Sequence, residues 1–375
     1  WVLGSSEEII LKFDDLRPGN HSLYYSLEHC TAEWQPSNLS PIEYLQSFSE
    51  DRINNYKNSF NTYIAYTHYE VKIPNLTVIP KISGNYLLKV YEDGDSRRLL
   101  LSRRLYVLEQ KVQLGAQIQQ SNNIAERSKR QKLNFSIFHP ALNIQNPYQE
   151  IKVLVMQNGR IDNAQWNTKP LFVRNNELVY SDLKTNDFYG GNEFRNFDTR
   201  SLRFKSQYTA GISLDSLYHT QLFKDISWNT SSYTSQFDEN GRFFILNQDG
   251  NDEDYDADYT WVNFTLDALE PDTHHYAYIV GDFNAWQKNI DNRMEYDVSS
   301  RQFHKSLLLK QGVYNYHYTW ADENGIAVDD HVFDGSFFQT ENNYQILVYY
   351  QRPGSRYDEL IGFTQINSLN GTTGK

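Results

Sequence analysis

Side chains that could take part in catalysis are plentiful in this chain, but their spacing matches no catalytic motif that we can identify. The 375 residues contain no His-Glu-x-x-His, no Gly-x-Ser-x-Gly and no Gly-x-x-x-x-Gly-Lys-Ser/Thr sequence. The ten histidines are scattered, and the one adjacent pair, His274 and His275, follows Pro271 in an expected turn. Neighbouring residues rarely point at one metal, so we interpret this pair as a solvated turn. We assign no catalytic residue and do not expect an enzyme.

Carboxylates are concentrated at residues 249–258, which read DGNDEDYDAD. Calcium favours such clustered oxygen ligands, and an EF-hand loop beginning at Asp252 would need Gly at position 257 and Glu at position 263. The sequence has Ala257 and Asn263 instead. The EF-hand interpretation therefore fails. We predict a solvated, turn-rich linker, and we expect no metal and no cofactor.

A single cysteine, Cys30, limits the redox and metal chemistry of the chain. It excludes a disulfide within the chain and a zinc site built from the chain's own thiolates. A nucleophilic role would need a nearby base, but His29 would point to the opposite face of a strand. The sequence predicts a buried and unreactive thiol.

The formal net charge of −12 restricts the possible partners. Such a charge repels nucleic acid and anionic membrane surfaces, so we expect neither as a partner. Local basic runs exist, notably at residues 127–130, and we interpret them as a solvated sheet face that could still meet an acidic partner. No apolar run is long enough to cross a bilayer. Direct membrane insertion is not expected.

Aromatic residues make up 15% of the chain, with tyrosine the most frequent, which is typical of half-buried sheets. Residues 132–137 and 151–156 read as strands, and Asn158-Gly159 is a strong hairpin signal. We predict an all-β fold of three consecutive immunoglobulin-like or early-set β-sandwiches. The expected divisions are an N-terminal sandwich at 1–109, a middle sandwich at 110–250, an early-set-like sandwich at 251–352, and an extended tail at 353–375 ending in a possible expression-vector remnant at 368–375.

Residues 190–203 form the most distinctive stretch of the sequence. Two adjacent glycines allow a sharp bend, and the aromatic, basic and acidic residues that follow show no helical period. One interpretation is a loop that Phe194 and Phe197 fix against a neighbouring sheet. The other is a surface that contacts a partner. The candidate partner-binding residues are Gly190, Gly191, Asn192, Glu193, Phe194, Arg195, Phe197 and Arg200.

This stretch resembles the middle of the plug protein family of the bacterial, Bacteroidetes-type type IX secretion system. The order and spacing of several segments carry the resemblance, which covers nearly the whole chain. The remaining segments are residues 24–34, 59–62, 66–69, 83–95, 309–314 and 346–350. The chain begins at Trp1 without an export signal, which we attribute to processing.

The resemblance implies a non-enzymatic function. It implies an exported protein that binds a very large outer-membrane β-barrel translocon and closes its periplasmic opening. The expected location is the periplasm, at the inner face of the outer membrane and held there by the partner. Outside that complex we expect a monomer.

Residues 281–286 suggest a different function, because Gly-Asp-Phe-Asn-x-Trp resembles a turn of early-set sandwiches that bind glycogen or starch. In that alternative, Phe283, Trp286 and Trp320 form a platform for sugar rings. In the structural interpretation, which we prefer, Phe283 and Trp286 cap the sandwich core. A polysaccharide-processing enzyme also stays open, because sequence does not give the separation of a carboxylate pair.

Overall fold

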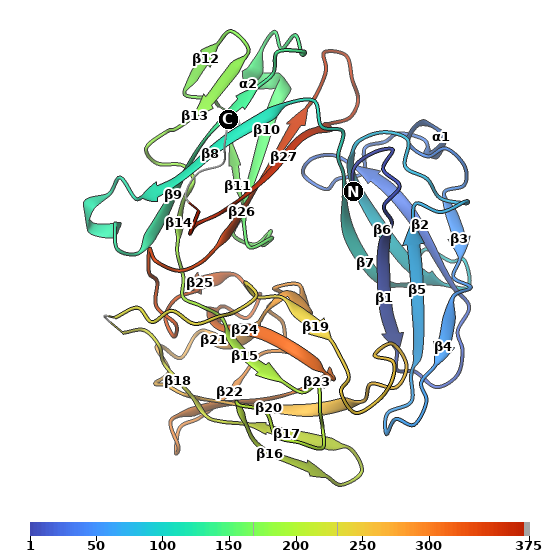
Figure 1. Cartoon of the computed structure of the whole chain (residues 1–375), viewed down its shortest axis with the longest axis vertical. Coiled ribbons are helices and arrows are strands. Elements are labelled where there is room, and N and C mark those ends of the chain that lie inside the picture. Colours follow the sequence, from blue (N-terminus) through green and yellow to red (C-terminus); the bar gives the residue numbers. More distant parts are fainter. Residues whose placement is uncertain (168, 231, 371–375) are drawn as a thin grey trace.

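The chain folds almost entirely into β-strands, as its computed structural model shows (Figure 1). The structure describes residues 1–167, 169–230 and 232–370, so most of the possible vector remnant lies outside the described residues. The α-helices of the described chain, α1 (Pro41–Tyr44) and α2 (Pro147–Glu150), are single turns. None of its helices is long and apolar enough to cross a membrane. The predicted all-β class is confirmed.

The N-terminal sandwich packs two antiparallel sheets around one hydrophobic core. Its sheets have the orders β3-β2-β6-β7 and β1-β5-β4. Strand β2 alternates between buried and partly exposed side chains, with Leu23, Tyr25 and Leu27 in the core. The strands are β1 (Ile9–Asp15), β2 (Leu23–Cys30), β3 (Glu50–Arg52), β4 (Tyr56–Asn58), β5 (Thr67–Ile73), β6 (Gly84–Glu92) and β7 (Leu99–Val107).

The middle sandwich combines strands from two distant parts of the chain. One sheet has the order β12-β13-β9-β14 with β8 also paired to β9, and the other has the order β11-β10-β26-β27. Leu133, Val153 and Ile346 meet in its core. The strands are β8 (Gln113–Gln120), β9 (Arg130–Phe138), β10 (Ile151–Gln157), β11 (Gln165–Asn167), β12 (Phe172–Arg174), β13 (Glu177–Tyr180), β14 (Asp187–Tyr189), β26 (Asn343–Tyr350) and β27 (Glu359–Asn367).

The third sandwich is made by the chain between β14 and β26. Its sheets are β15-β24-β19, joined by β21 and β25, and β16-β17-β20-β23-β22, joined by β18. Phe197, Phe264 and Tyr316 lie at the centre of its core. The strands are β15 (Arg195–Asp198), β16 (Thr209–Leu214), β17 (Tyr218–Leu222), β18 (Asp225–Ile226), β19 (Phe243–Ile245), β20 (Tyr259–Asp267), β21 (Tyr276–Val280), β22 (Glu295–Asp297), β23 (Gln302–Lys310), β24 (Gly312–Ala321) and β25 (Ala327–Asp329).

These pairings differ from the divisions expected at 110–250, 251–352 and 353–375. Strands β15 to β19 precede residue 250 but belong to the third sandwich, and β26 returns to pair with β10 of the middle sandwich. The expected tail contains β27, which pairs with β26 along its length. The third sandwich is therefore an insertion into the middle one. Alternation shows which side chains of a strand are buried, but not which core they enter.

The acidic segment 249–258 is not the solvated linker that we predicted. Asp258 accepts hydrogen bonds from the backbone N–H groups of Tyr63 (2.7 Å) and Ile64 (3.3 Å) in the N-terminal sandwich. Asp254 forms an ion pair with Lys12 at 2.7 Å. The segment thus fastens the third sandwich to the first.

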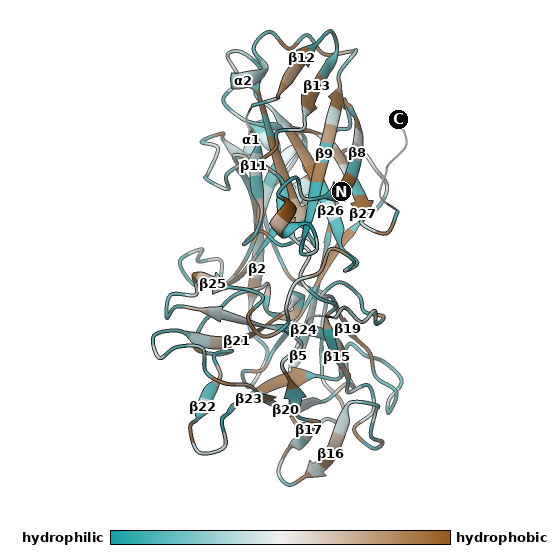
Figure 2. Cartoon of the chain, turned by 90° about the vertical axis from the view of Figure 1, so that its left-hand side faces the viewer, coloured by the Kyte–Doolittle hydropathy of each residue, from teal (hydrophilic) through white to brown (hydrophobic). Residues whose placement is uncertain are grey.

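Each sandwich contacts both of the others. A cluster that includes Ala32, Leu154 and Tyr349 joins the first sandwich to the middle one. The middle and third sandwiches are joined by polar contacts, including a hydrogen bond from Lys288 Nζ to Asp162 at 3.0 Å. Figure 2 shows apolar colouring on strands of the middle sandwich such as β12 and β13, whereas β22 of the third sandwich is hydrophilic.

Candidate functional site

The two glycines that open the distinctive stretch permit a close contact between segments. Gly190 donates its N–H to Lys129 O at 2.8 Å, and a Cβ atom there would lie 2.0 Å from Phe337 O. Gly191 has a φ of +67°, a conformation that glycine adopts without steric penalty. These positions therefore require glycine because of packing and backbone geometry.

The residues that follow enter the interior of the third sandwich. Glu193, Phe194, Arg195 and Phe197 expose between 0% and 5% of their surface. The expectation that these side chains form an exposed partner-binding surface is wrong for this conformation. The interpretation in which the phenylalanines fix the stretch against a sheet describes it correctly, because Phe197 stacks on Tyr314 at 5.0 Å.

Arg195 illustrates why this stretch is structural. Its guanidinium is held by Asp334 at 2.6 Å and Asp225 at 3.0 Å, and it lies 3.8 Å from the centre of the Trp228 ring. Asn192 donates to Asp334 O at 2.8 Å. These contacts saturate the polar groups that we had assigned to a partner.

Arg200, the last candidate of the stretch, is the exception. It pairs with Asp198 at 2.6 Å and retains 36% exposure of its side chain. This residue remains available to another protein.

Glu193, which is buried, and Asp238, which is half-buried, form a carboxyl pair beside this stretch. Glu193 accepts a short hydrogen bond from the Tyr233 hydroxyl, and Asp238 accepts one from Phe194 N. Burial raises the pKa of Asp238 to about 7, with a further contribution from the nearby Glu193 charge. Burial also raises the pKa of Glu193. The pair therefore favours a bound proton near neutral pH.

The aromatic residues of the glycan alternative are not arranged as a platform. Trp286 and Trp320 expose 7% and 2% of their surface. Trp286 packs against Phe194 at 5.7 Å and under the Arg160 guanidinium at 4.7 Å, and Phe283 meets the edge of Tyr314 at 5.7 Å. A sugar ring needs an exposed aromatic face, so this expectation is wrong and the preferred capping interpretation is correct.

Cys30 is buried, as predicted. Burial raises the pKa of its thiol to about 11, and the negative charge of Glu28 acts in the same direction. The thiolate, which is the reactive form, is therefore disfavoured at neutral pH.

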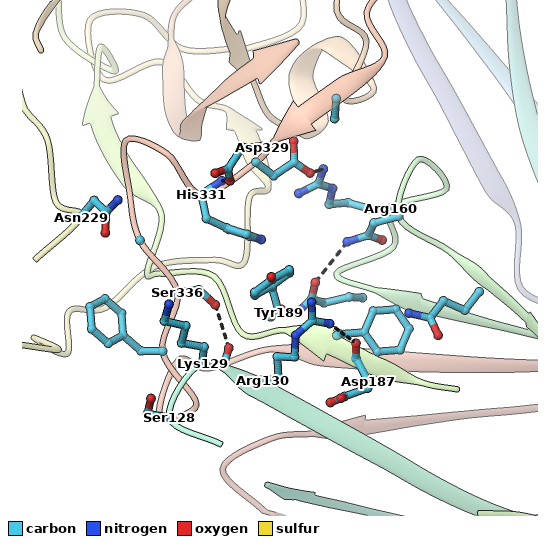
Figure 3. A pocket seen from close by; sticks show the side chains of 18 of the residues that line it. Ser128, Lys129, Arg130, Arg160, Asp187, Tyr189, Asn229, Asp329, His331 and Ser336 are labelled. Carbon is cyan, nitrogen blue, oxygen red and sulfur yellow. Dashed lines mark hydrogen bonds and ion pairs between the residues drawn. The ribbon is translucent and has the colours of Figure 1, made fainter. Parts of the chain in front are cut away.

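A cleft of about 750 Å³ lies where the middle and third sandwiches meet (Figure 3). The wall that the middle sandwich forms comes from the start of β9, from β14 and from the turn between β10 and β11. Its opposite wall comes from residues 229–230 and the segment 327–337. The charged and aromatic lining residues are Lys129, Arg130, Arg160, Asp187, Phe188, Tyr189, Asp329, Asp330, His331 and Phe337.

Tyr189 lies at the centre of this cleft. The Arg130 guanidinium is 3.6 Å from the centre of its ring, and the His331 ring is 4.9 Å away. Figure 3 shows Tyr189 and His331 pointing toward each other from opposite walls. Arg130 also donates to Asp187 O at 2.8 Å, which fixes its direction.

Arg160 carries the electrostatic link between the walls. It pairs with Asp162 at 2.7 Å and with Asp330 at 2.9 Å. Burial opposes ionisation of Asp330, but the charge of Arg160 outweighs it and lowers the pKa of Asp330. Burial lowers the pKa of His331, despite the charges of Asp330 and Asp329. His331 is therefore favoured as a neutral imidazole.

The cleft presents charged, amide and aromatic groups that can bind a ligand. Among its described lining residues, no serine or threonine hydroxyl is hydrogen-bonded to a histidine, and none is a cysteine. In the described ranges no group of three His, Cys, Asp or Glu side chains is placed to hold a metal. Only the basic run 127–130 signalled this site in the sequence, because the other lining residues come from separate segments.

The fold and the cleft define a protein of braced β-sandwiches that is equipped for binding. A family model described as "Type 9 secretion system plug protein 1st domain" matches residues 1–109. The chain belongs to the plug protein family of the type 9 secretion system.

One solved structure resembles the chain over nearly its full length. It is the crystal structure of a hypothetical protein from Parabacteroides merdae ATCC 43184, with 33% sequence identity and a TM-score of 0.93. The alignment covers 98% of this chain and 92% of that one. No curated protein matches.

Proposed function

We propose that this chain is a non-enzymatic plug that binds the outer-membrane translocon of the type 9 secretion system and closes its periplasmic opening. The observation that carries the proposal is the family match over residues 1–109. That match gives the chain a role related to type 9 secretion. Binding and closure of the translocon are the further steps that we propose.

The bracing of the three sandwiches supports this proposal physically. The first and third sandwiches are joined through Asp14 and Lys310, and the first and middle ones through the cluster around Leu154 and Tyr349. A block that is braced on every side can fill an opening without first rearranging. Such preorganisation lowers the entropic cost of binding.

The proposed location follows from the same family membership. The plug works in the periplasm, and its association with the inner face of the outer membrane is through the translocon. We propose that it is a monomer when it is not bound. Of the stretch 190–203, we retain Arg200 as a candidate contact, because the other proposed side chains have partners inside the protein or are tightly packed.

Affinity purification from native envelopes tests the binding step. The tagged chain is expected to recover one very large outer-membrane β-barrel at near-equal amounts. A tagged periplasmic protein of similar mass and charge serves as the control. Recovery of no barrel under conditions that preserve envelope complexes would contradict the proposal.

Conductance of the purified barrel in a planar bilayer tests the closure step separately. Adding the chain to the periplasmic side is expected to lower the conductance, whereas the control protein leaves it unchanged. Binding without any fall in conductance would show that the chain is a partner of the translocon but not its plug.

A further inference from the structure

We propose that the cleft between the middle and third sandwiches binds an extended acidic segment of another polypeptide. Lys129 and Arg130 would meet its carboxylates, and the amide and aromatic groups around Tyr189 would hold its backbone. This proposal goes beyond closure of the translocon and does not depend on it.

Several hydrogen-bond donors in the cleft have no partner in the described chain. The Lys129 side chain is exposed, and neither its ammonium group nor the Tyr189 hydroxyl makes an ion pair or hydrogen bond within the described residues. Arg130 uses Nε and Nη1 and leaves Nη2 free. These are three unpaired donors among the lining residues, and two of them are cationic. Such donors suit a carboxylate, because charge-assisted hydrogen bonds are the strong ones.

The acidic lining residues argue against a continuous polyanion as the ligand. Asp329 is exposed in the same cleft, and Asp187 and Asp330 are half-buried there. A nucleic acid or polyphosphate would be repelled by them, whereas a peptide can place a carboxylate at Lys129 and an N–H group near Asp329. A lining with both charges therefore favours a polypeptide whose acidic residues are separated by neutral ones over a continuous polyanion.

Amide side chains of the middle sandwich also line the cleft. That of Gln157 is engaged within the protein, because its Nε2 donates to Tyr189 O and its Oε1 accepts from Asn163 Nδ2. Gln157, Asn163 and Gln165 line the cleft together. The Asn163 Oδ1 atom is buried and has no hydrogen-bond partner in the described chain. Because this atom is buried, a ligand N–H can reach it only when the Asn163 side chain turns toward the cleft. The ligand then satisfies an acceptor that has no partner in the described chain.

The cleft is already formed and has the size of a ligand site. Its volume of about 750 Å³ falls within the range of roughly 300–1,000 Å³ for ligand pockets. Ser336 crosses between the walls, donating to Lys129 O at 2.7 Å and accepting from Gly191 N at 3.0 Å. Little rearrangement is needed before binding.

Fluorescence anisotropy with the purified full chain tests the proposal. The probe is a fluorescein-labelled octapeptide of alternating Glu and Ser, compared with its Gln/Ser and Lys/Ser analogues. We expect saturable binding of the Glu/Ser peptide that weakens with salt. Lys129→Glu is expected to weaken that binding about tenfold or more, because it replaces a charge-assisted contact by repulsion.

Arg103→Glu is the matched control, because it reverses one exposed basic charge in β7 of the N-terminal sandwich, outside the cleft. It is expected to change the affinity less than twofold, with both variants keeping the circular dichroism spectrum of the wild-type chain. Equal binding of the Gln/Ser analogue, equal weakening by both variants, or no saturable binding would overturn the proposal. Inorganic phosphate and a single-stranded oligonucleotide serve as competitors. If either displaces the peptide at a concentration equal to or below that of the peptide, the site binds anions in general, and the proposal is overturned.

Discussion

Asp14 of the N-terminal sandwich and Lys310 of the third sandwich form an ion pair of 2.7 Å, and each side chain is only 6% exposed. Tyr259 and His68 also hydrogen-bond to Asp14, at 2.8 Å and 2.6 Å. Burial raises the pKa of Asp14, but these hydrogen bonds and the Lys310 charge outweigh it and hold the pKa below its usual value. Burial lowers the pKa of Lys310. The two sandwiches are therefore joined by a buried charged contact.

Lys310→Met is expected to destabilise the protein by about 3–5 kcal/mol, because it leaves the Asp14 carboxylate buried without its cation. Urea denaturation measures this loss. Lys12→Met removes another ion pair between the same two sandwiches, Lys12 with Asp254, which is more exposed at 42% and 29%. Its expected cost is below about 1 kcal/mol. Equal losses in the two variants would show that burial of Asp14 and Lys310 does not matter.

The carboxyl pair of Glu193 and Asp238 predicts a pH dependence of stability. The pKa of Asp238 in the folded chain, about 7, is above its ordinary value, so its contribution is fully present below about pH 4. That contribution is lost as the pH rises through 7. In the wild-type chain, the free energy of unfolding is expected to fall by a few kcal/mol between pH 5 and 8. Asp238→Asn is expected to remove most of this fall, because the variant has no carboxyl group to ionise at this position.

Asp215→Asn is the control for this prediction. Hydrogen bonds from Leu217 N and from Ser216 lower the pKa of Asp215, so Asp215 does not titrate between pH 5 and 8. Its removal is expected to leave the slope unchanged in that window. Denaturant midpoints measured from pH 5 to 8 for both variants give the comparison. If the fall in stability with pH is unchanged in Asp238→Asn, Asp238 is not the group that causes it.

Local patterns predicted many strands of this fold but not their partners. Residues 151–156 fall in β10, and Asn158 and Gly159 both take positive φ in the turn that follows it. Residues 346–350, one of the segments that carry the family resemblance, fall in β26. Their alternation could not show that Ile346 lies opposite Val155, 191 positions earlier in the chain, instead of in the third sandwich. Contacts between distant segments leave no period in the sequence.

The same limit applies to the candidate site. The run 127–130 was visible as a basic patch, but nothing in the sequence placed it beside Tyr189 and His331. The stretch 190–203 was correctly singled out as unusual. Its aromatic and charged residues are needed inside the protein because the chain crosses there from one sandwich to the next, and interior and interface residues have similar composition.

Trp286→Ala is expected to destabilise the protein by about 3–5 kcal/mol, because it empties a packed site between Phe194 and Arg160. Retention on glycogen or starch columns is expected to be the same for the folded variant and the wild-type chain. Trp166, which is 40% exposed, provides a control whose replacement by alanine has a smaller effect on stability. Retention of the wild-type chain that Trp286→Ala abolishes without loss of fold would restore the glycan-binding alternative.

Strand β27 is expected to be essential to the middle sandwich, although the sequence suggested an extended tail. Ile361 and Ile366 of this strand are 0% and 2% exposed and lie in the middle core. A chain that stops after Gln351 therefore exposes this core and is expected to lose cooperative unfolding of the middle sandwich. A chain that stops after Asn370 keeps β27 and is expected to unfold as the full chain does.

A milder variant tests the same relationship in a chain that still folds. Ile361→Ala is expected to cost about 2–5 kcal/mol, since it opens a cavity in a packed core. Ile290→Ala removes the same atoms from a side chain that is 64% exposed, and its effect is expected to stay within about 0.5 kcal/mol. Thermal and urea denaturation of both variants give the comparison. Similar small effects would mean that β27 does not pack on the middle core in solution, and the insertion of the third sandwich into the middle one would then lose its main support.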